Sequence, residues 1–333
     1  MTDLKRRRVR LGIVGAGKTA RWHLRAYAKI PEVEIVAIAN PHSYRGLTLA
    51  QRYGIRECFR SCDEMLRHAD IEAVDICAPT GLHKDMVIAA LNRDLHVYVE
   101  KPMCRSVNEA DEIIGINKQR RRIIFNGFNY RFWPEILKIK TMIASGKLGN
   151  IRWINLVRTL KSPSSYMFDP ELGTGIINEL SSHFIDLLYW WGFGNPVHIH
   201  VHETNLLDGR ISPDTVSINL EYKDGLRVSI FNSFGIAGVY PEILIAGTQK
   251  TLNLKHGKIF TDNKSSYGLP ELILRAINES MFFPRIFHNP FNGSCRYFID
   301  CVLGKQINQA DEYAARKVLV ITALANRLSN LHP

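Results

Sequence analysis

The chain has 333 residues, of which 46% are hydrophobic and 23% charged, a balance typical of a soluble globular protein with room for two domains. This composition excludes collagen, coiled-coil and disordered proteins, and no run of about 18 apolar residues predicts a transmembrane segment. The net charge is +11, but the two basic runs, residues 5–10 and 120–122, contain no aromatic residues, so we predict no nucleic-acid binding.

The first half of the chain alternates short apolar strands with amphipathic helices. This alternation is typical of an α/β protein with a doubly wound, Rossmann-type parallel sheet, in which ligands bind beyond the carboxyl ends of the strands. The predicted strands are Val9–Val14, Val33–Ala39, Ala73–Cys77, Leu95–Val99 and Ile123–Asn126. The predicted helices are Lys18–Lys29, Ser43–Tyr53, Asp63–His68, Lys84–Asn92 and Ser106–Gln119.

A glycine-rich turn follows the first predicted strand, with the pattern Gly12-x-x-Gly15-x-Gly17-x-x-Ala20. Gly15 is expected to make the tight turn, and Gly17 to let the backbone approach a pyrophosphate. The N–H groups at the start of the next helix favour the same anion. The turn therefore predicts a dinucleotide site that includes Gly12, Gly15, Ala16, Gly17, Lys18 and Thr19.

The residue after the second strand bears on the choice between NAD and NADP. A NAD-selective site carries Asp or Glu there to hold the ribose 2′-hydroxyl, but this chain has Asn40. His42, Ser43 and Arg45 follow and offer contacts to a 2′-phosphate. Arg45 is equally compatible with a helix-surface position. The sequence accordingly predicts NAD(P), with NADP slightly favoured.

Polar residues also follow two later strands, in the runs Pro79-Thr80-Gly81-Leu82-His83 and Glu100-Lys101-Pro102. An ammonium at Lys101, placed over the cleft, would hydrogen-bond a substrate hydroxyl and favour its alkoxide. The alternative is a surface ion pair between Lys101 and Glu100.

In the second half, Glu179, His183 and Asp186 stand at i, i+4 and i+7, which predicts one face of a helix. Imidazole titrates near neutrality, so His183 can take a hydroxyl proton, with a nearby carboxylate fixing its tautomer. The alternative is a helix residue that packs against the sheet. The six cysteines form no Cys-x-x-Cys pair and no His-Cys cluster with zinc spacing, so we predict no metal site. Free thiols and the absence of an apolar signal stretch predict a cytoplasmic protein.

The remaining segments predict a mainly antiparallel sheet with two further helices. The expected helices are Cys295–Leu303 and Asp311–Leu328, and the apolar run Leu269–Phe283 is interpreted as a lid, an oligomer contact or a membrane-surface helix. The expected strands are Ile151–Thr159, His198–Leu206, Thr215–Tyr222, Leu226–Asn232, Glu242–Ala246 and Lys250–Lys255.

In their order along the chain, these motifs resemble the glucose-fructose oxidoreductase/inositol dehydrogenase (Gfo/Idh/MocA) family, most strongly over residues 9–190. The resemblance also includes Gly127-Phe-Asn-Tyr-Arg-Phe-x-Pro134, Gly146-x-Leu148-Gly149 and Gly173-x-Gly175. It implies a dinucleotide-binding domain over residues 1–128 and an α+β substrate-binding and oligomerisation domain over residues 129–333. The cofactor residues that it implies are Pro79, Thr80, His83, Glu100 and Lys101; the substrate residues are Lys101, Asn129, Arg131, Glu179 and His183.

Within this resemblance, Lys101 contacts substrate and nicotinamide, and His183 is the acid/base residue. Glu179 replaces the aspartate usual in the family and is one methylene longer, and Ser181 replaces a glycine. We predict a homo-oligomeric NAD(P)-dependent dehydrogenase or reductase for a sugar, polyol or nucleotide sugar. An anionic substrate would suit the net charge. The alternatives are a dinucleotide-binding regulator without turnover and a glycosidase that uses NAD without net redox change.

Overall fold

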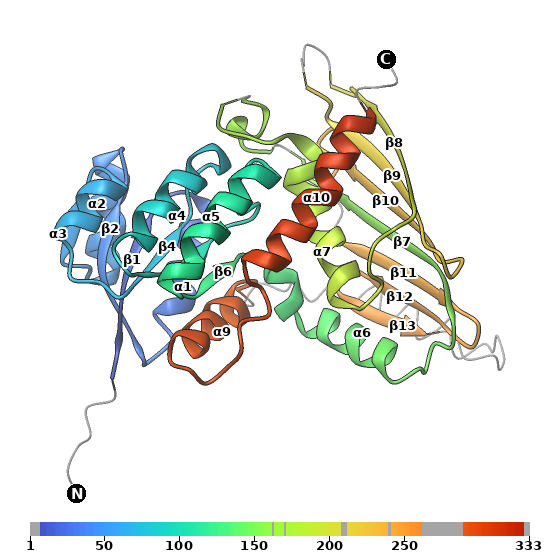
Figure 1. The fold of residues 1–333 in the computed structure, drawn as a ribbon, viewed down its shortest axis with the longest axis horizontal. Helices are drawn as coiled ribbons and strands as arrows, with labels where there is room; N and C mark the ends of the chain where they lie inside the picture. The colour runs from blue at the N-terminus through green and yellow to red at the C-terminus, as the bar shows by residue number, and fades with distance from the viewer. Residues whose placement is uncertain are drawn as a thin grey trace, which may run out of the picture.

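The computed structural model describes residues 7–161, 163–169, 171–207, 212–238, 241–261 and 289–329, which form two sheets with helices packed on them (Figure 1). The first sheet has six parallel strands in the order β3-β2-β1-β4-β5-β6. The order reverses between β1 and β4, and the carboxyl ends of these two strands mark the expected ligand edge. The strands are β1 (Val9–Val14), β2 (Val33–Ala39), β3 (Glu57–Phe59), β4 (Ala73–Ile76), β5 (His96–Val99) and β6 (Ile124–Asn126).

Five helices cover the two faces of this sheet, which explains why its central strands carry apolar side chains in both directions. Ser61 and Ser106 cap two of the helices by accepting hydrogen bonds from the backbone N–H groups of Glu64 and Glu109. The helices are α1 (Lys18–Tyr27), α2 (Ser43–Tyr53), α3 (Cys62–His68), α4 (His83–Leu91) and α5 (Val107–Arg120). The predicted parallel α/β architecture is confirmed; the short strand β3 was not among the predicted strands.

The second sheet has seven strands in the order β13-β12-β11-β7-β10-β9-β8. Its pairs are antiparallel except for β7 with β10, so the predicted mainly antiparallel sheet is also confirmed. The strands are β7 (Ile151–Thr159), β8 (His198–Thr204), β9 (Thr215–Glu221), β10 (Arg227–Ser233), β11 (Glu242–Gly247), β12 (Thr251–Lys255) and β13 (Lys258–Thr261). The last of these was not predicted, and the apolar run 269–283 lies outside the described residues.

Helices cover one face of the second sheet and connect it to the first (Figure 1). Helix α10 (Glu312–Ser329) contacts α7 (Ser182–Trp190), β8 and α5, while α9 (Asn292–Val302) contacts α1. Helix α6 (Pro134–Ala144) lies near the other end of the same face. Because α9 and α10 return to the first half, the domain boundary at residue 128 stays a prediction.

The segment before α10 also hydrogen-bonds to β6, one of the two edge strands of the first sheet. The backbone N–H of Asn126 in β6 donates to the carbonyl oxygen of Ala310 at 2.7 Å, and the Asn308 amide donates to the carbonyl oxygen of Ile124 at 2.7 Å. In the part of the chain that the structure describes, no helix combines the length and apolar character needed to cross a membrane.

Candidate active site

The glycine turn has the geometry that a pyrophosphate site requires. Gly15 has φ +104°, and a Cβ there would lie 2.6 Å from the carbonyl oxygen of Cys77, so only glycine fits. Gly17 is the N-cap of α1, and a Cβ added to it would meet nothing within 4 Å. The space beside Gly17 is therefore open at the start of the helix, where a diphosphate can approach the backbone. Gly12 differs, because its Cβ position faces Met65 and Ile71 in the core.

Asn40 lies at the carboxyl end of β2, beside this turn. Its side-chain amide donates to the carbonyl oxygen of His42 at 2.8 Å, and its side chain is buried. Arg45 is exposed on the first turn of α2. No carboxylate occupies position 40, so nothing at this position repels a 2′-phosphate.

Lys101 is held by Glu179 rather than by its neighbour Glu100. The Lys101 ammonium donates to the backbone carbonyl of Glu179 at 2.6 Å and lies 3.4 Å from its Oε2. The hydroxyls of Thr80 and Thr174 donate to Oε1 at 3.4 and 3.1 Å. The alternative surface pair is therefore wrong, because the longer Glu179 side chain reaches Lys101 inside a buried network.

Glu179 belongs to a π-helical turn, Ile177–Ser181, which precedes α7. The sequence did not predict this wider turn, a feature often found at functional sites, and the shared face of Glu179, His183 and Asp186 stays a prediction. Asp186 accepts bonds from the guanidinium of Arg131, which also donates to the carbonyl oxygen of Gln309. The prediction that a carboxylate hydrogen-bonds His183 is wrong, because Glu179 contacts Lys101 and Asp186 contacts Arg131. Arg131, a predicted substrate residue, is thus buried in an ion pair.

His183 is an almost buried imidazole, 7% exposed, and it stacks on Tyr130 with ring centroids 4.1 Å apart. Its Nδ1 has no hydrogen-bond partner among the described residues. Burial, followed by the positive charges of Lys101 and Arg158, lowers the pKa of His183 well below its usual value. At neutral pH the ring is therefore uncharged and able to accept a proton.

Two other predicted residues are buried close by. His83 directs Nδ1 to the carbonyl oxygen of Pro102 and Nε2 to that of Ala78, both at 2.8 Å. It lies between the loops that follow β4 and β5. Burial lowers its pKa, and the neutral ring donates to only one of the two carbonyl oxygens, but both of its nitrogens face the backbone rather than a cofactor. Asn129 is 6% exposed, and its Oδ1 has no partner in the described part of the chain.

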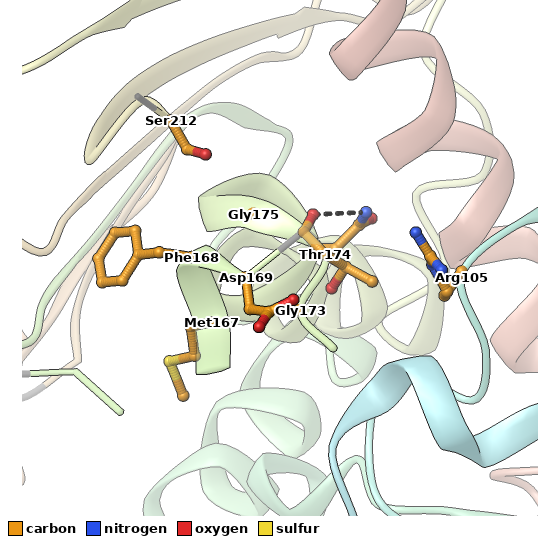
Figure 2. A pocket seen from close by; sticks show the side chains of 9 residues that line it. Arg105, Met167, Phe168, Asp169, Gly173, Thr174, Gly175 and Ser212 are labelled. Carbon is orange, nitrogen blue, oxygen red and sulfur yellow. Dashed lines mark hydrogen bonds between the residues drawn. The ribbon is translucent and has the colours of Figure 1, made fainter. Parts of the chain in front are cut away.

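Beside this network lies a cavity of about 240 Å³, which the sequence did not reveal (Figure 2). Thr174 belongs both to its wall and to the Glu179 network, whereas Lys101 and His183 do not line it. The Gly173-x-Gly175 motif was a partial signal, but nothing marked Arg105. The lining residues are Arg105, Met167, Phe168, Asp169, Gly173, Thr174, Gly175, Asn178 and Ser212.

Comparison with known proteins identifies the family. Residues 9–128 match the oxidoreductase family with an NAD-binding Rossmann fold (GFO_IDH_MocA), and residues 136–253 match the GFO/IDH/MocA C-terminal domain. D-glucoside 3-dehydrogenase of Escherichia coli is 24% identical over 327 residues, which cover 91% of this chain and 90% of that protein. Myo-inositol 2-dehydrogenase of Thermotoga maritima is 24% identical over 261 residues, 77% of this chain and 75% of that protein.

A solved structure shows the same fold. The WlbA dehydrogenase of Bordetella pertussis, in complex with NADH and UDP-GlcNAcA, superimposes with a TM-score of 0.84 at 20% identity. The match covers 100% of this chain and 98% of the WlbA chain. The two family matches cover the first sheet and most of the second. The protein therefore belongs to the Gfo/Idh/MocA family of NAD-binding oxidoreductases and is an NAD(P)-dependent dehydrogenase or reductase.

Proposed function

We propose that this enzyme moves a hydride between the nicotinamide of NAD(P) and a carbinol or carbonyl carbon of a sugar, polyol or nucleotide sugar. The observation that carries the proposal is a Lys101 ammonium that Glu179 holds in place, together with a buried His183 whose Nδ1 has no hydrogen-bond partner among the described residues. The curated relatives named for glucosides and inositol support a substrate with several hydroxyl groups.

The dinucleotide is proposed to lie across the carboxyl edge of the first sheet. Gly15, Ala16, Gly17, Lys18 and Thr19 would hold the pyrophosphate. Asn40 and Arg45 would contact the adenosine ribose, and Pro79, Thr80, Glu100 and Lys101 the nicotinamide half. When bound, the nicotinamide accepts or supplies the hydride.

In the oxidation direction, we assign the proton to His183. The neutral imidazole accepts the hydroxyl proton while the hydride leaves the carbon that bears this hydroxyl and passes to the nicotinamide. The C–O single bond thereby becomes a carbonyl. Lys101 donates a hydrogen bond to that oxygen and stabilises its developing negative charge. Glu179 orients Lys101, and reduction runs through the same groups in reverse.

The cavity beside Glu179 is a suitable place for the rest of the substrate. Thr174, Asn178 and Ser212 offer hydrogen bonds to hydroxyl groups, and Phe168 offers an apolar surface. Arg105 lines the same cavity and favours an anionic substituent. The Asp169 carboxylate lines the cavity as well, so a sugar acid, a nucleotide sugar and an uncharged polyol all remain candidates.

The experiment is calorimetric titration with NAD, NADH, NADP and NADPH, followed by a screen of sugars for net reduction of the bound cofactor. Binding with net reduction supports the proposal. Binding with glycoside cleavage but without net reduction would replace it with a glycosidase, and binding without any turnover would replace it with a regulator. No binding of any dinucleotide would overturn it altogether.

We propose that NADP is the preferred cofactor and that Arg45 contacts its 2′-phosphate. Arg45→Ala should raise the Kd for NADP about tenfold, because one charge-assisted hydrogen bond is lost, and leave the Kd for NAD nearly unchanged. Arg52→Ala is the matched control, since Arg52 is exposed at the other end of the same helix. Equal changes for the two cofactors would place the 2′-phosphate elsewhere.

We propose a homo-oligomer formed through the second sheet. On the face opposite the helices, the side chains of Trp153 and Phe260 are 42% and 47% exposed to solvent. Ile154 and Leu156 point the other way, into the core. Exposed aromatic side chains on an open sheet face are suited to subunit contact. Light scattering should give a multiple of the 38.0 kDa chain mass, and Trp153→Arg should shift it toward the monomer. A monomeric wild type would contradict this.

We also propose a cytoplasmic location. All six cysteines are free thiols, and four of them are buried. Thiols persist in a reducing compartment, where oxidation does not pair them. Fractionation of cells that express the protein would test the location.

A further inference from the structure

A buried histidine joins two carboxylates directly behind the proposed nicotinamide site. His23 lies on α1 and is 0% exposed. Its Nδ1 is 2.7 Å from Oδ2 of Asp75, which is 0% exposed on β4. Its Nε2 is 3.2 Å from Oε1 of Glu100, whose side chain keeps 13% exposure at the end of β5. The imidazole therefore connects two neighbouring strands of the first sheet.

The charge state of His23 follows from its contacts with Asp75 and Glu100. A neutral imidazole has one N–H, yet both of its nitrogens face carboxylate oxygens. Burial alone would lower the pKa of His23, but the surrounding acidic groups, chiefly Asp75, raise the pKa well above its usual value. The contact between Nε2 and Oε1 is an ion pair rather than an aligned hydrogen bond, and neither atom has another partner among the described residues. The position of the Glu100 carboxylate therefore depends on its ion pair with the His23 imidazolium.

The surroundings leave His23 little freedom. Its ring makes an edge contact with Tyr98 at 4.9 Å and a tilted contact with Phe291 at 4.5 Å, measured between ring centroids. Burial raises the pKa of each phenol and thiol in this group, so these groups stay neutral. The titratable groups that face His23 are Asp75, Glu100, Tyr27, Tyr98, Cys77 and Cys295.

The same residues do not have the spacing of a metal site. The ligand atoms of His23, Asp75 and Cys295 lie within 4.8 Å of one another. However, two ligands at about 2.0–2.1 Å from one tetrahedral zinc are roughly 3.3 Å apart. The 2.7 Å separation of Nδ1 from Oδ2 is instead that of a hydrogen bond.

On its other side, Glu100 is accommodated by a glycine. A Cβ at Gly127 would lie 2.7 Å from Oε1 of Glu100, so a side chain there would displace the carboxylate. Glu100 directly precedes Lys101 at the carboxyl edge of the sheet, where a carboxylate can accept hydrogen bonds from hydroxyl groups.

We propose that His23 is a positioning residue: its imidazolium, backed by Asp75, fixes the Glu100 carboxylate so that Glu100 accepts a hydrogen bond from a ribose hydroxyl of the dinucleotide. This inference rests on the proposed function. It predicts that His23, which never touches the cofactor, determines part of the cofactor affinity through Glu100.

The test is a double-mutant cycle on dinucleotide binding, with His23→Gln, Glu100→Gln and the double variant, measured by calorimetry. Each single change should raise the Kd for the dinucleotide about tenfold. The Kd of the double variant should not exceed the higher of the two single-variant values, because the same interaction is lost in all three variants. His96→Gln, at the opposite end of β5, is the control and should bind as the wild type does. If His23→Gln does not fold, Asp75→Asn takes its place in the cycle.

The pH dependence adds a readout that packing alone would not change. In the wild type the Kd should rise at alkaline pH as His23 loses its proton, and His23→Gln should lack this dependence. Additive effects in the cycle, an unchanged Kd in the single variants, or stoichiometric zinc in the purified protein would each overturn the inference. A wild type that binds no dinucleotide would overturn the proposed function instead.

Discussion

Replacement of His183 with alanine should lower kcat for substrate oxidation by about 10³-fold, because the variant lacks the group that accepts the hydroxyl proton. The Kd for the dinucleotide should stay nearly unchanged, since the pyrophosphate contacts lie on the glycine turn. Stopped-flow measurement of NAD(P)H formation gives the rate, and thermal melting confirms that the variant is folded. The control is His200→Ala, an exposed histidine on β8.

The pH profile makes this prediction more specific. Burial, Lys101 and Arg158 lower the pKa of His183, and the neutral ring is the form that accepts a proton. Oxidation should therefore proceed fully above the lowered pKa and decline only as the pH falls through it, so the acid limb of kcat/KM lies below about 6.5. A near-normal kcat in His183→Ala, or an acid limb at or above that pH, would remove His183 from this role.

Lys101→Ala should lower kcat by about 10²- to 10³-fold, the usual loss when one donor to a developing oxyanion is removed. The variant should also show a second change. Without the neighbouring positive charge, the pKa of His183 should rise, and the acid limb of the pH profile should move upward. Dinucleotide binding should change much less than kcat.

The shift of the acid limb distinguishes a specific electrostatic role of Lys101 from a general loss of active-site structure. Lys138→Ala, on the exposed side of α6, is the matched control and should alter neither kcat nor the pH profile. Glu179→Gln should fall between Lys101→Ala and the wild type, because the backbone carbonyl of residue 179 still accepts from the ammonium. If Lys101→Ala keeps the acid limb of the wild type, the two groups do not interact as the structure indicates.

Local sequence patterns predicted the parallel sheet and the glycine turn, because both depend on residues close together in the chain. The strands that were missed, β3 and β13, lie at the edges of their sheets. Their sequences, Glu-Cys-Phe and Lys-Ile-Phe-Thr, are only partly buried and lack the apolar run by which the equally short inner strands were predicted. The π turn was missed for a different reason. The spacing of Glu179 and His183 suits an α-helix, and no residue in the run marks the wider turn.

The partners of the site residues were harder to predict than the residues themselves. Lys101 and Glu179 are 78 positions apart, and Arg131 and Asp186 are 55 apart, so their pairing is decided by how the two sheets pack. The buried ion pair of Arg131 also shows why a cation in a family motif need not face the substrate. A residue such as Thr174 acquires its role only when its hydroxyl meets Glu179.

The closure of β6 by Ala310 and Asn308 has a consequence for synthesis of the protein on the ribosome. The first half of the chain emerges with the glycine turn and all six parallel strands, but the outer edge of β6 stays unpaired until the segment before α10 is made. During that interval the nascent sheet offers a free edge to other strands, which is the usual starting point for aggregation. Chaperones would therefore meet a nascent chain whose cofactor turn is complete while the outer edge of β6 is still unpaired.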